Sequence, residues 1–250
     1  MRLIFWTPFN RAMFPQIHRN KKDIHPSLTE SWILPRFRIW DKLTWHSIQN
    51  QSFSDWRYVV CCHEKSRDIT DGLFSTIKDK RLIVCYTNEE KKWVNEIGRG
   101  QDRIVSVRVD SDDMYHPQAA AEVLSYAEFG HQYVSFRYGY AMEYATGRMF
   151  NYDCGGTGPF FGHIRGNRDW GRCRGINDIN HVQIAKYHPL IVPQRRFIVG
   201  LTRMNTSTSM GIKNVGRELI GENAAYARQM FNLRCKNANW FCRSFRNKVN

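Results

Sequence analysis

The chain lacks the features that place a protein in a membrane or in the secretory pathway. No apolar run reaches the ~18 residues that a membrane-spanning helix needs. The apolar start, Met1–Trp6, gives way to Thr7-Pro8 too early for a signal peptide, and a first buried strand explains it better. We therefore expect a cytoplasmic protein.

Paired cysteine motifs are also missing. The sequence has no CxxC pair, which argues against a structural zinc site. Its seven cysteines are odd in number, and their spacings form no recognisable disulfide framework. Cys61 and Cys62 stand in an apolar run, where thiols behave as small hydrophobic groups. The cysteines thus agree with a reducing compartment.

Repeats and low-complexity tracts are absent, and the composition is that of a folded chain. The protein has 250 residues, of which 42% are hydrophobic and 14% aromatic. This is enough for one large domain with a substantial core, or for one domain with a short appendage.

Basic residues are in excess. The net charge is +14 and the isoelectric point is about 9.7. Nucleic acid, an anionic membrane surface or a phosphorylated substrate would each suit such a charge. No RRM, KH, zinc-finger or helix-turn-helix pattern is present, and the basic residues are spread along the chain. Binding to nucleic acid is therefore the weaker alternative.

Apolar runs of strand length alternate with polar, helix-compatible stretches in the first half of the chain. The runs 56–62, 81–86 and 103–109 are typical of strands that are buried on both faces. Stretches 68–78 and 88–97 lie between them. This alternation predicts an α/β fold with a mainly parallel open sheet and crossover helices.

Other segments have weaker patterns. Helical periodicity covers 27–47, where Pro35 marks a break or a kink, and a further helix is expected over 117–129. Segment 132–144 is strand-like. The Gly- and Arg-rich segment 155–174 indicates a long loop, and 181–192 and 196–201 indicate strands or short helices.

An acidic cluster follows the third apolar run. Asp110, Asp112 and Asp113 stand at the carboxyl end of a predicted strand, where open α/β sheets bind ligands. Three neighbouring carboxylates repel one another unless a cation compensates them, and Mg²⁺ and Mn²⁺ prefer such oxygen ligands. The alternative is a solvated turn that caps the following helix.

The ordered motifs resemble a family. The segment Val107–Met114 resembles the Arg-hydrophobic-Asp-x-Asp-Asp motif of a family of rhamnosyltransferase-like proteins within the GT-A class of glycosyltransferases. Three further segments match this family in order, and the resemblance covers roughly the first half of the chain. They are Thr7–Asn10, Trp32–Trp40 with its paired Arg36-Phe37, and Ser47–Trp56.

The resemblance implies a GT-A-type open sheet, a nucleotide-sugar donor (dTDP- or UDP-linked) and a divalent metal, Mn²⁺ or Mg²⁺. By position, Asp110 lies near the ribose or donor sugar, and Asp112 ligates the metal with Asp113 as the other candidate. Arg108 faces the donor phosphates or, as an alternative, forms a structural salt bridge to these aspartates.

The early loop is implied to line the nucleotide pocket through Thr7, Asn10 and Arg11, against the alternative of a plain surface loop. His63 and Glu64 end the second apolar run at the same predicted edge. They are candidates for contact with the nucleotide base, although a strand-end turn is the simpler explanation.

The second half departs from the family. The family has a histidine-containing strand end followed by Ser-Asn, where this chain has Thr202, Arg203 and Asn205. Asn205 fits, and Arg203 is a substitute phosphate clamp because guanidinium matches phosphate geometry. Thr202 stands where the histidine is expected, which places the metal dependence in question.

Transfer with inversion needs a base for the acceptor hydroxyl. Asp153, Asp169, Asp178 and His181 lie in the expected acceptor region, and we favour Asp169 or His181 as the catalytic base. The segment Gly155–Pro159 is no P-loop, because the Lys-Ser/Thr signature is missing.

The sequence thus predicts a glycosyltransferase that moves a sugar from a nucleotide-sugar donor to a hydroxyl of a carbohydrate or glycan-like acceptor. We expect a catalytic domain over 1–212 and a basic, partly helical extension over 213–250. The extension has eight Lys or Arg against two Glu, a local charge of +6. It is a candidate for peripheral contact with an anionic membrane. The remaining alternative is a binding protein without catalysis.

Overall fold

A computed structural model of the chain describes residues 1–10, 26–86, 89–128, 133–143, 146–154, 161–166, 190–193, 198–202 and 215–231. Its strands are β1 (Arg2–Pro8), β2 (Trp56–Cys62), β3 (Leu82–Tyr86), β4 (Arg103–Arg108), β5 (Met114–Tyr115), β6 (Tyr133–Ser135), β7 (Tyr138–Glu143), β8 (Met149–Asp153), β9 (Phe161–Gly166), β10 (Leu190–Ile191), β11 (Ile198–Thr202) and β12 (Val215–Leu219). Its helices are η1 (Pro26–Leu28), α2 (Glu30–Ile39), η2 (Trp40–Trp45), α3 (His46–Gln49), η3 (Glu64–Ser66), α4 (Arg67–Phe74), α5 (Glu90–Gly98), α6 (Ala119–Glu128) and α8 (Gly221–Met230).

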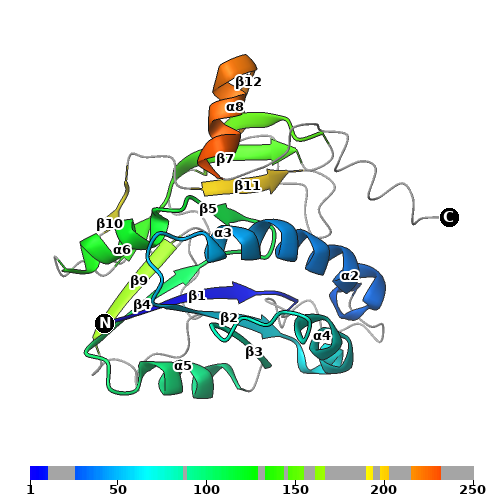
Figure 1. The fold of residues 1–250 in the computed structure, drawn as a ribbon, viewed down its shortest axis with the longest axis vertical. Helices are drawn as coiled ribbons and strands as arrows, with labels where there is room; N and C mark the ends of the chain where they lie inside the picture. The colour runs from blue at the N-terminus through cyan, green and yellow to red at the C-terminus, as the bar shows by residue number, and fades with distance from the viewer. Residues whose placement is uncertain are drawn as a thin grey trace, which may run out of the picture.

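The larger sheet has seven strands in the order β10-β6-β9-β4-β1-β2-β3 (Figure 1). Strands β1 to β4 are parallel to one another, and only β9 runs the other way. Helices flank both faces of this sheet. The predicted fold class, an α/β fold with an open, mainly parallel sheet between helices, is confirmed.

The apolar runs predicted as central strands are buried because they are covered on both faces. On one face, Trp40 stacks on Trp45 at 5.7 Å between ring centroids and on Tyr58 at 5.9 Å. On the other face, Trp6, Cys61 and Cys85 pack beneath α5. Cys61 and Cys85 are directly opposite each other in register, with 3.3 Å between their sulfurs.

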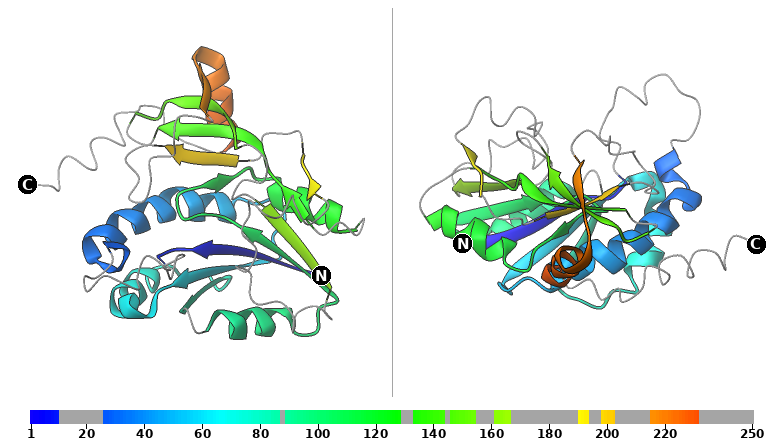
Figure 2. Two further views of the ribbon diagram at one scale, coloured as in Figure 1. Left: turned by 180° about the vertical axis from the view of Figure 1, so that it is seen from behind. Right: turned by 90° about the horizontal axis from the view of Figure 1, so that it is seen from above.

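A second sheet was not expected from the sequence. It has five strands in the order β12-β8-β7-β11-β5. The continuous helical stretch α2-η2-α3 lies between the two sheets (Figures 1 and 2). Trp40 and Trp45 of this stretch face the seven-stranded sheet. Ile39 and Leu43 pack with residues of the five-stranded sheet and with Phe231 after α8.

One local prediction is wrong, and the structure adds detail to two others. The helix continues through Pro35 and becomes a π-helix at Trp40, so no break occurs there, and the alternative of a kink stays a prediction. The segment expected as a long loop contains β9, which inserts between β4 and β6. The boundary predicted at 212/213 stays a prediction; in the described part of the extension, β12 pairs with β8 and Ala227 of α8 is buried.

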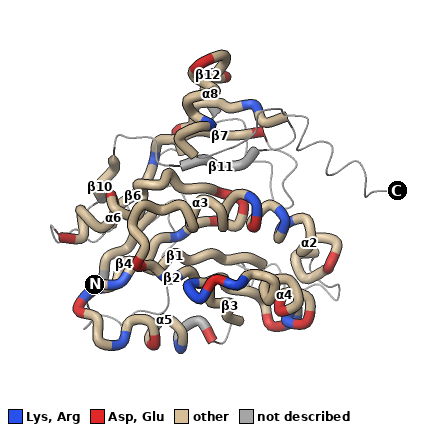
Figure 3. Tube along the Cα trace, in the orientation of Figure 1, with Lys and Arg blue, Asp and Glu red and all other residues tan. Residues whose placement is uncertain are grey.

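None of the described helices is long and apolar enough to cross a membrane. Each of the helices α2, α4 and α5 carries both acidic and basic residues (Figure 3).

Candidate functional site

The carboxyl ends of β1, β2 and β4 meet at one edge of the seven-stranded sheet. Backbone hydrogen bonds extend past the strands, from Phe9 N–H to Cys61 O at 2.9 Å and from Val109 N–H to Trp6 O at 2.9 Å. The parallel sheet thereby gathers the polar residues that follow the three strands. This is the edge at which open α/β folds bind ligands.

Thr7 lies beneath this edge and is fully buried. Its hydroxyl donates to Val109 O at 2.7 Å and is 2.6 Å from the hydroxyl of Tyr58. Trp40 Nε1–H donates to the same Tyr58 hydroxyl at 2.8 Å. The side chain of Thr7 is thus enclosed within the core and supports the edge, and its predicted place in the nucleotide pocket stays a prediction.

Asn10 joins the end of β1 to the start of α4. Its Oδ1 accepts from the backbone N–H of His63 at 2.8 Å, and its Nδ2 donates to Ser66 Oγ at 2.8 Å and to Ser27 O at 3.1 Å. The side chain is buried. These hydrogen bonds connect three chain segments, so Asn10 fixes the backbone at this edge of the sheet.

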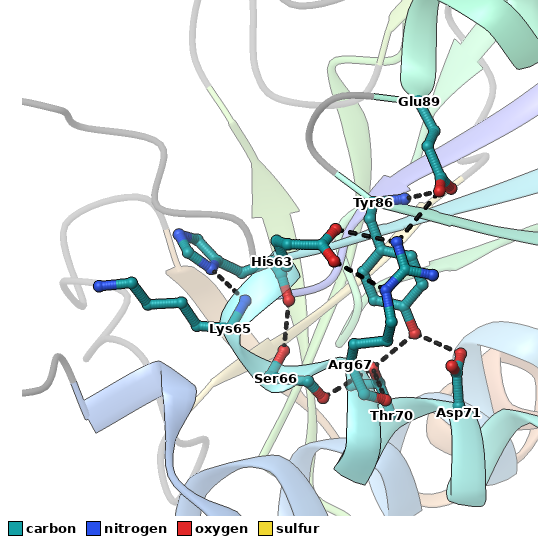
Figure 4. Close-up of polar contacts among 9 residues, drawn as sticks. His63, Lys65, Ser66, Arg67, Thr70, Asp71, Tyr86 and Glu89 are labelled. Carbon is teal, nitrogen blue, oxygen red and sulfur yellow. Dashed lines mark hydrogen bonds and ion pairs between the residues drawn. The ribbon is translucent and has the colours of Figure 1, made fainter.

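The chain turns directly after β2, where η3 begins at Glu64 with His63 as its N-cap (Figure 4). A strand-end turn was the simpler of the two sequence interpretations. His63 Nδ1 accepts from Lys65 N–H at 3.1 Å and caps η3. Both Glu64 oxygens accept from Arg67, which also donates to Glu89 at 3.0 Å. The Arg67 guanidinium lies 3.6 Å from the ring centroid of Tyr86, and its hydrogen bonds lower the pKa of Glu64.

The acidic turn, Asp110–Asp113, closes through a backbone hydrogen bond from Asp113 N–H to Asp110 O at 3.0 Å. Arg36 of α2 binds this turn from the side. Its two terminal nitrogens donate to the two oxygens of Asp112 at 2.7 and 2.9 Å, and its Nε donates to Ser111 Oγ at 2.7 Å. Arg36 is 5% exposed and Asp112 is 6% exposed, so this is a buried ion pair.

A second arginine holds the first residue of the turn. Arg108 Nε donates to Asp110 Oδ1 at 2.9 Å, which is the salt bridge that the sequence offered as the alternative role of Arg108. Tyr115 anchors the same strand end by donating its hydroxyl hydrogen to Arg108 O at 2.7 Å. The side chain of Asp110 is 28% exposed, whereas Asp113 is buried.

Burial dominates the electrostatics of the turn. It raises the pKa of Asp112, and the positive charge of Arg36 opposes that rise. Burial also raises the pKa of Tyr58 and of Tyr115, and the negative charge of Asp110 adds to both shifts. The two tyrosines therefore stay neutral hydrogen-bonding groups under the edge.

The donor set for a divalent metal does not fit as the resemblance implies. Both oxygens of Asp112 already accept hydrogen bonds from a guanidinium, whose positive charge would repel a metal ion at the same carboxylate. Over the part of the chain that the structure describes, no three His, Cys, Asp or Glu side chains gather as a metal site.

Several predicted site residues lie outside the described residues. They are Arg11, Asp169, Asp178, His181, Arg203 and Asn205. Asp153 is described and lies in β8 of the five-stranded sheet, where both of its oxygens accept from Arg137. The acceptor-side predictions for Asp169 and His181 therefore stay predictions.

Arg36 is the main residue of this site that the sequence interpretation did not assign. A signal was present, because Arg36 falls on the same helical face as Ile33 and Ile39, three residues away on either side, and all three are buried. An arginine on a buried helix face needs an acidic partner. Its partner lies 76 positions further along the chain, which helix periodicity cannot identify.

A hollow of about 600 Å³ lies away from this edge, beside the residues that precede β3. Trp45, Lys78 and Lys80 are among its lining residues. It is therefore separate from the acidic turn, and we assign the candidate site on the polar groups of the sheet edge instead.

No known protein family matches the chain, and no curated protein sequence matches it. Solved structures of similar fold do exist. S. aureus TarS 1-349 in complex with UDP has a TM-score of 0.43 and 9% identity over 81% of this chain. This chain spans 61% of the length of that structure. A second structure, S. aureus TarS 1-349, matches with 11% identity and a TM-score of 0.42. This match covers 100% of this chain and 76% of the TarS chain.

A third similar structure, described as a glucose-1-phosphate thymidylyltransferase of Bacillus anthracis in complex with a sucrose, has a TM-score of 0.39 and 8% identity. The match covers 93% of this chain and 99% of the chain in that structure. Because every one of these TM-scores is below 0.5, we take no ligand, activity or partner from these proteins.

Proposed function

We propose that this chain is a glycosyltransferase whose nucleotide-sugar donor binds at the carboxyl ends of β1, β2 and β4. The observation that carries the proposal is the partly exposed carboxylate of Asp110. It stands at the edge above a layer of buried, hydrogen-bonded polar groups, Thr7, Tyr58 and Tyr115. A carboxylate in this place accepts hydrogen bonds from ribose or sugar hydroxyls.

In the reaction, the bond between the anomeric carbon and the diphosphate oxygen breaks, and a bond to the acceptor oxygen forms. The acceptor hydroxyl loses its proton to a base, for which Asp169 and His181 are the candidates. The rigid turn supplies orientation, since fixing the donor before reaction lowers the entropic part of the barrier. We derive no step through a metal, because Asp112 is engaged by Arg36.

Finer details rest on the sequence resemblance. It supports a dTDP- or UDP-linked sugar as the donor, for example a rhamnose, and a carbohydrate or glycan-like molecule as the acceptor. Arg11, Arg203 and Asn205 are proposed to contact the donor phosphates or nucleoside. The basic segment after residue 212 is proposed to contact an anionic membrane.

The test is a thermal-unfolding series with UDP, dTDP, GDP and CDP, on the whole chain and on Asp110→Asn. A nucleotide at about 100 times its dissociation constant should stabilise the chain by about 2.7 kcal/mol. We expect one nucleotide to raise the unfolding temperature of the wild type and to lose most of that effect in Asp110→Asn. No shift with any of the four would contradict the proposal.

A further inference from the structure

The acidic turn carries its own counter-charges. Three carboxylates, Asp110, Asp112 and Asp113, lie next to two guanidinium groups, Arg36 and Arg108, which leaves a formal charge of −1 on the group. The two arginines approach from different directions. Arg108 belongs to the strand that leads into the turn, and Arg36 comes from a helix 76 positions away from Asp112. The repulsion among the carboxylates is therefore compensated within the chain.

The Arg36 contact fixes the orientation of the turn as well as its charge. Three of its nitrogens each donate to the turn, two to Asp112 and one to Ser111. Guanidinium is planar and rigid, so this set of bonds determines where both residues lie relative to α2. Ser111 is 1% exposed and Asp112 is 6% exposed. The middle of the turn is thereby held inside the protein.

Asp110 is held differently. One of its oxygens accepts from Arg108, and its side chain keeps 28% of its surface exposed. The turn thus has an inner carboxylate, engaged on both oxygens by a buried arginine, and an outer carboxylate that reaches solvent. These two carboxylates have different capacities to bind anything that arrives from solution.

We propose that Arg36 is a positioning residue that takes the place of a cation at Asp112. Asp112 is then an internal anchor rather than a metal ligand, and Asp110 is the carboxylate that the turn presents to the donor. The role of Asp110 rests on the proposed function. The assignments of Arg36 and Asp112 rest on the ion pair alone.

The first test compares Asp112→Asn with its matched control Asp110→Asn, without ligand, in thermal unfolding. Asp112→Asn removes the carboxylate that the buried Arg36 binds through two hydrogen bonds, so we expect it to lower the unfolding temperature by roughly 5 °C or more. Asp110→Asn, in the more exposed pair, should lower it by less than half as much. If Asp112 were a metal ligand held against two other carboxylates, its neutralisation would relieve repulsion. An unchanged or raised unfolding temperature in Asp112→Asn would therefore overturn the inference.

The second test measures Mn²⁺ binding to the same proteins by electron paramagnetic resonance. We expect Asp112→Asn to bind the same amount of Mn²⁺ as the wild type. Loss of a stoichiometric Mn²⁺ site in Asp112→Asn, with the site retained in a control such as Asp79→Asn, would overturn the inference. Both tests need no nucleotide, so they decide it even if the proposed function fails.

The third test separates positioning from folding. The affinities for UDP and dTDP are measured by calorimetry in EDTA and in millimolar Mn²⁺, at a temperature where wild type and Arg36→Lys are both fully folded. Lysine keeps the charge but loses the planar fork. For the nucleotide that binds, we expect the two wild-type affinities to agree within about threefold. Arg36→Lys should bind it about tenfold or more weakly in both conditions.

Two results of the third test count against the inference. One is an affinity of Arg36→Lys equal to that of the wild type. The other is wild-type binding that appears only with Mn²⁺ and loses this dependence in Asp112→Asn. A chain that binds neither nucleotide contradicts the proposed function, and the first two tests then decide the role of Arg36.

Discussion

Two arginine–carboxylate pairs with the same hydrogen-bond distances lie in different regions of the molecule. At the edge of the seven-stranded sheet, Arg36 binds Asp112 through two bonds of 2.7 and 2.9 Å. On the five-stranded sheet, Arg148 binds Glu218 through two bonds of 2.7 and 2.9 Å. The first pair has exposed side-chain fractions of 6% and 9%, and the second has 49% and 37%.

The comparison shows that burial, more than hydrogen-bond geometry, determines what such a pair does. Water screens the exposed pair and competes for its hydrogen bonds, so its two partners are nearly independent in energy. The buried partners have left water, and each needs the other's charge. The first pair therefore organises a turn at the candidate site, while the second adds little to the surface on which it lies.

The largest expected effect comes from breaking the buried pair. Arg36→Met leaves the carboxylate of Asp112 buried without its counter-charge, and we expect a loss of about 3–5 kcal/mol in the free energy of unfolding. Urea denaturation measures it. The matched control is the double variant Arg36→Met with Asp112→Leu, which replaces both charges with apolar groups. We expect it to recover most of the lost stability, and a double variant as unstable as the single one would contradict this account.

An intermediate effect is expected from two glycines, one in each sheet. A Cβ on Gly162 of β9 would lie 2.8 Å from Val123 Cγ1 of α6, whereas a Cβ on Gly216 of β12 would lie 3.3 Å from Asn151 Cβ. The valine has one strongly preferred rotamer in a helix and cannot easily move. We expect Gly162→Ala to lose about 1–3 kcal/mol.

Gly216→Ala is the matched variant in the five-stranded sheet. Gly216 is exposed, and a Cβ there would be less crowded than one on Gly162. Alanine also lowers the conformational entropy of the unfolded chain, which offsets part of any loss in stability. We expect its unfolding free energy to stay within about 0.5 kcal/mol of the wild type. Equal losses in the two variants, measured by the same urea titration, would show that the two sheets tolerate added volume alike.

The smallest effect is expected from the exposed pair. Glu218→Gln removes a carboxylate that is well screened by water, and we expect the unfolding temperature to change by less than about 2 °C. High salt should make the difference smaller still. If Glu218→Gln lowered the unfolding temperature as much as Arg36→Met does, burial would not distinguish the two pairs.

The two regions also differ in how much their sequences predict. Strands β1, β2 and β4 are nearly continuous apolar runs, since they are covered on both faces. Strand β9 was missed because Phe161–Gly166 contains two glycines, a histidine and an arginine, a composition typical of loops. Position 162 requires a glycine because α6 packs so closely against β9 that a Cβ would collide with Val123. That requirement arises from tertiary packing and leaves no periodic pattern in the sequence.

The candidate site divides in the same way. The position of Asp110–Asp113 after an apolar run predicted an acidic group at the ligand edge, because strand direction alone brings it there. The partners of Asp112 and Thr7 were not predicted, since they come from other elements, as Arg36 and Tyr58 do. Sequence spacing within one segment carries no information about such partners.

The central claim, that a nucleotide binds at the edge formed by β1, β2 and β4, is tested most directly by hydrogen exchange. Amide exchange is compared with and without a saturating amount of the nucleotide that stabilises the chain. We predict slower exchange in peptides that contain Asp110–Asp113 and in those that contain His63–Arg67. Protection confined to the five-stranded sheet and α8, with the acidic turn unchanged, would contradict the claim.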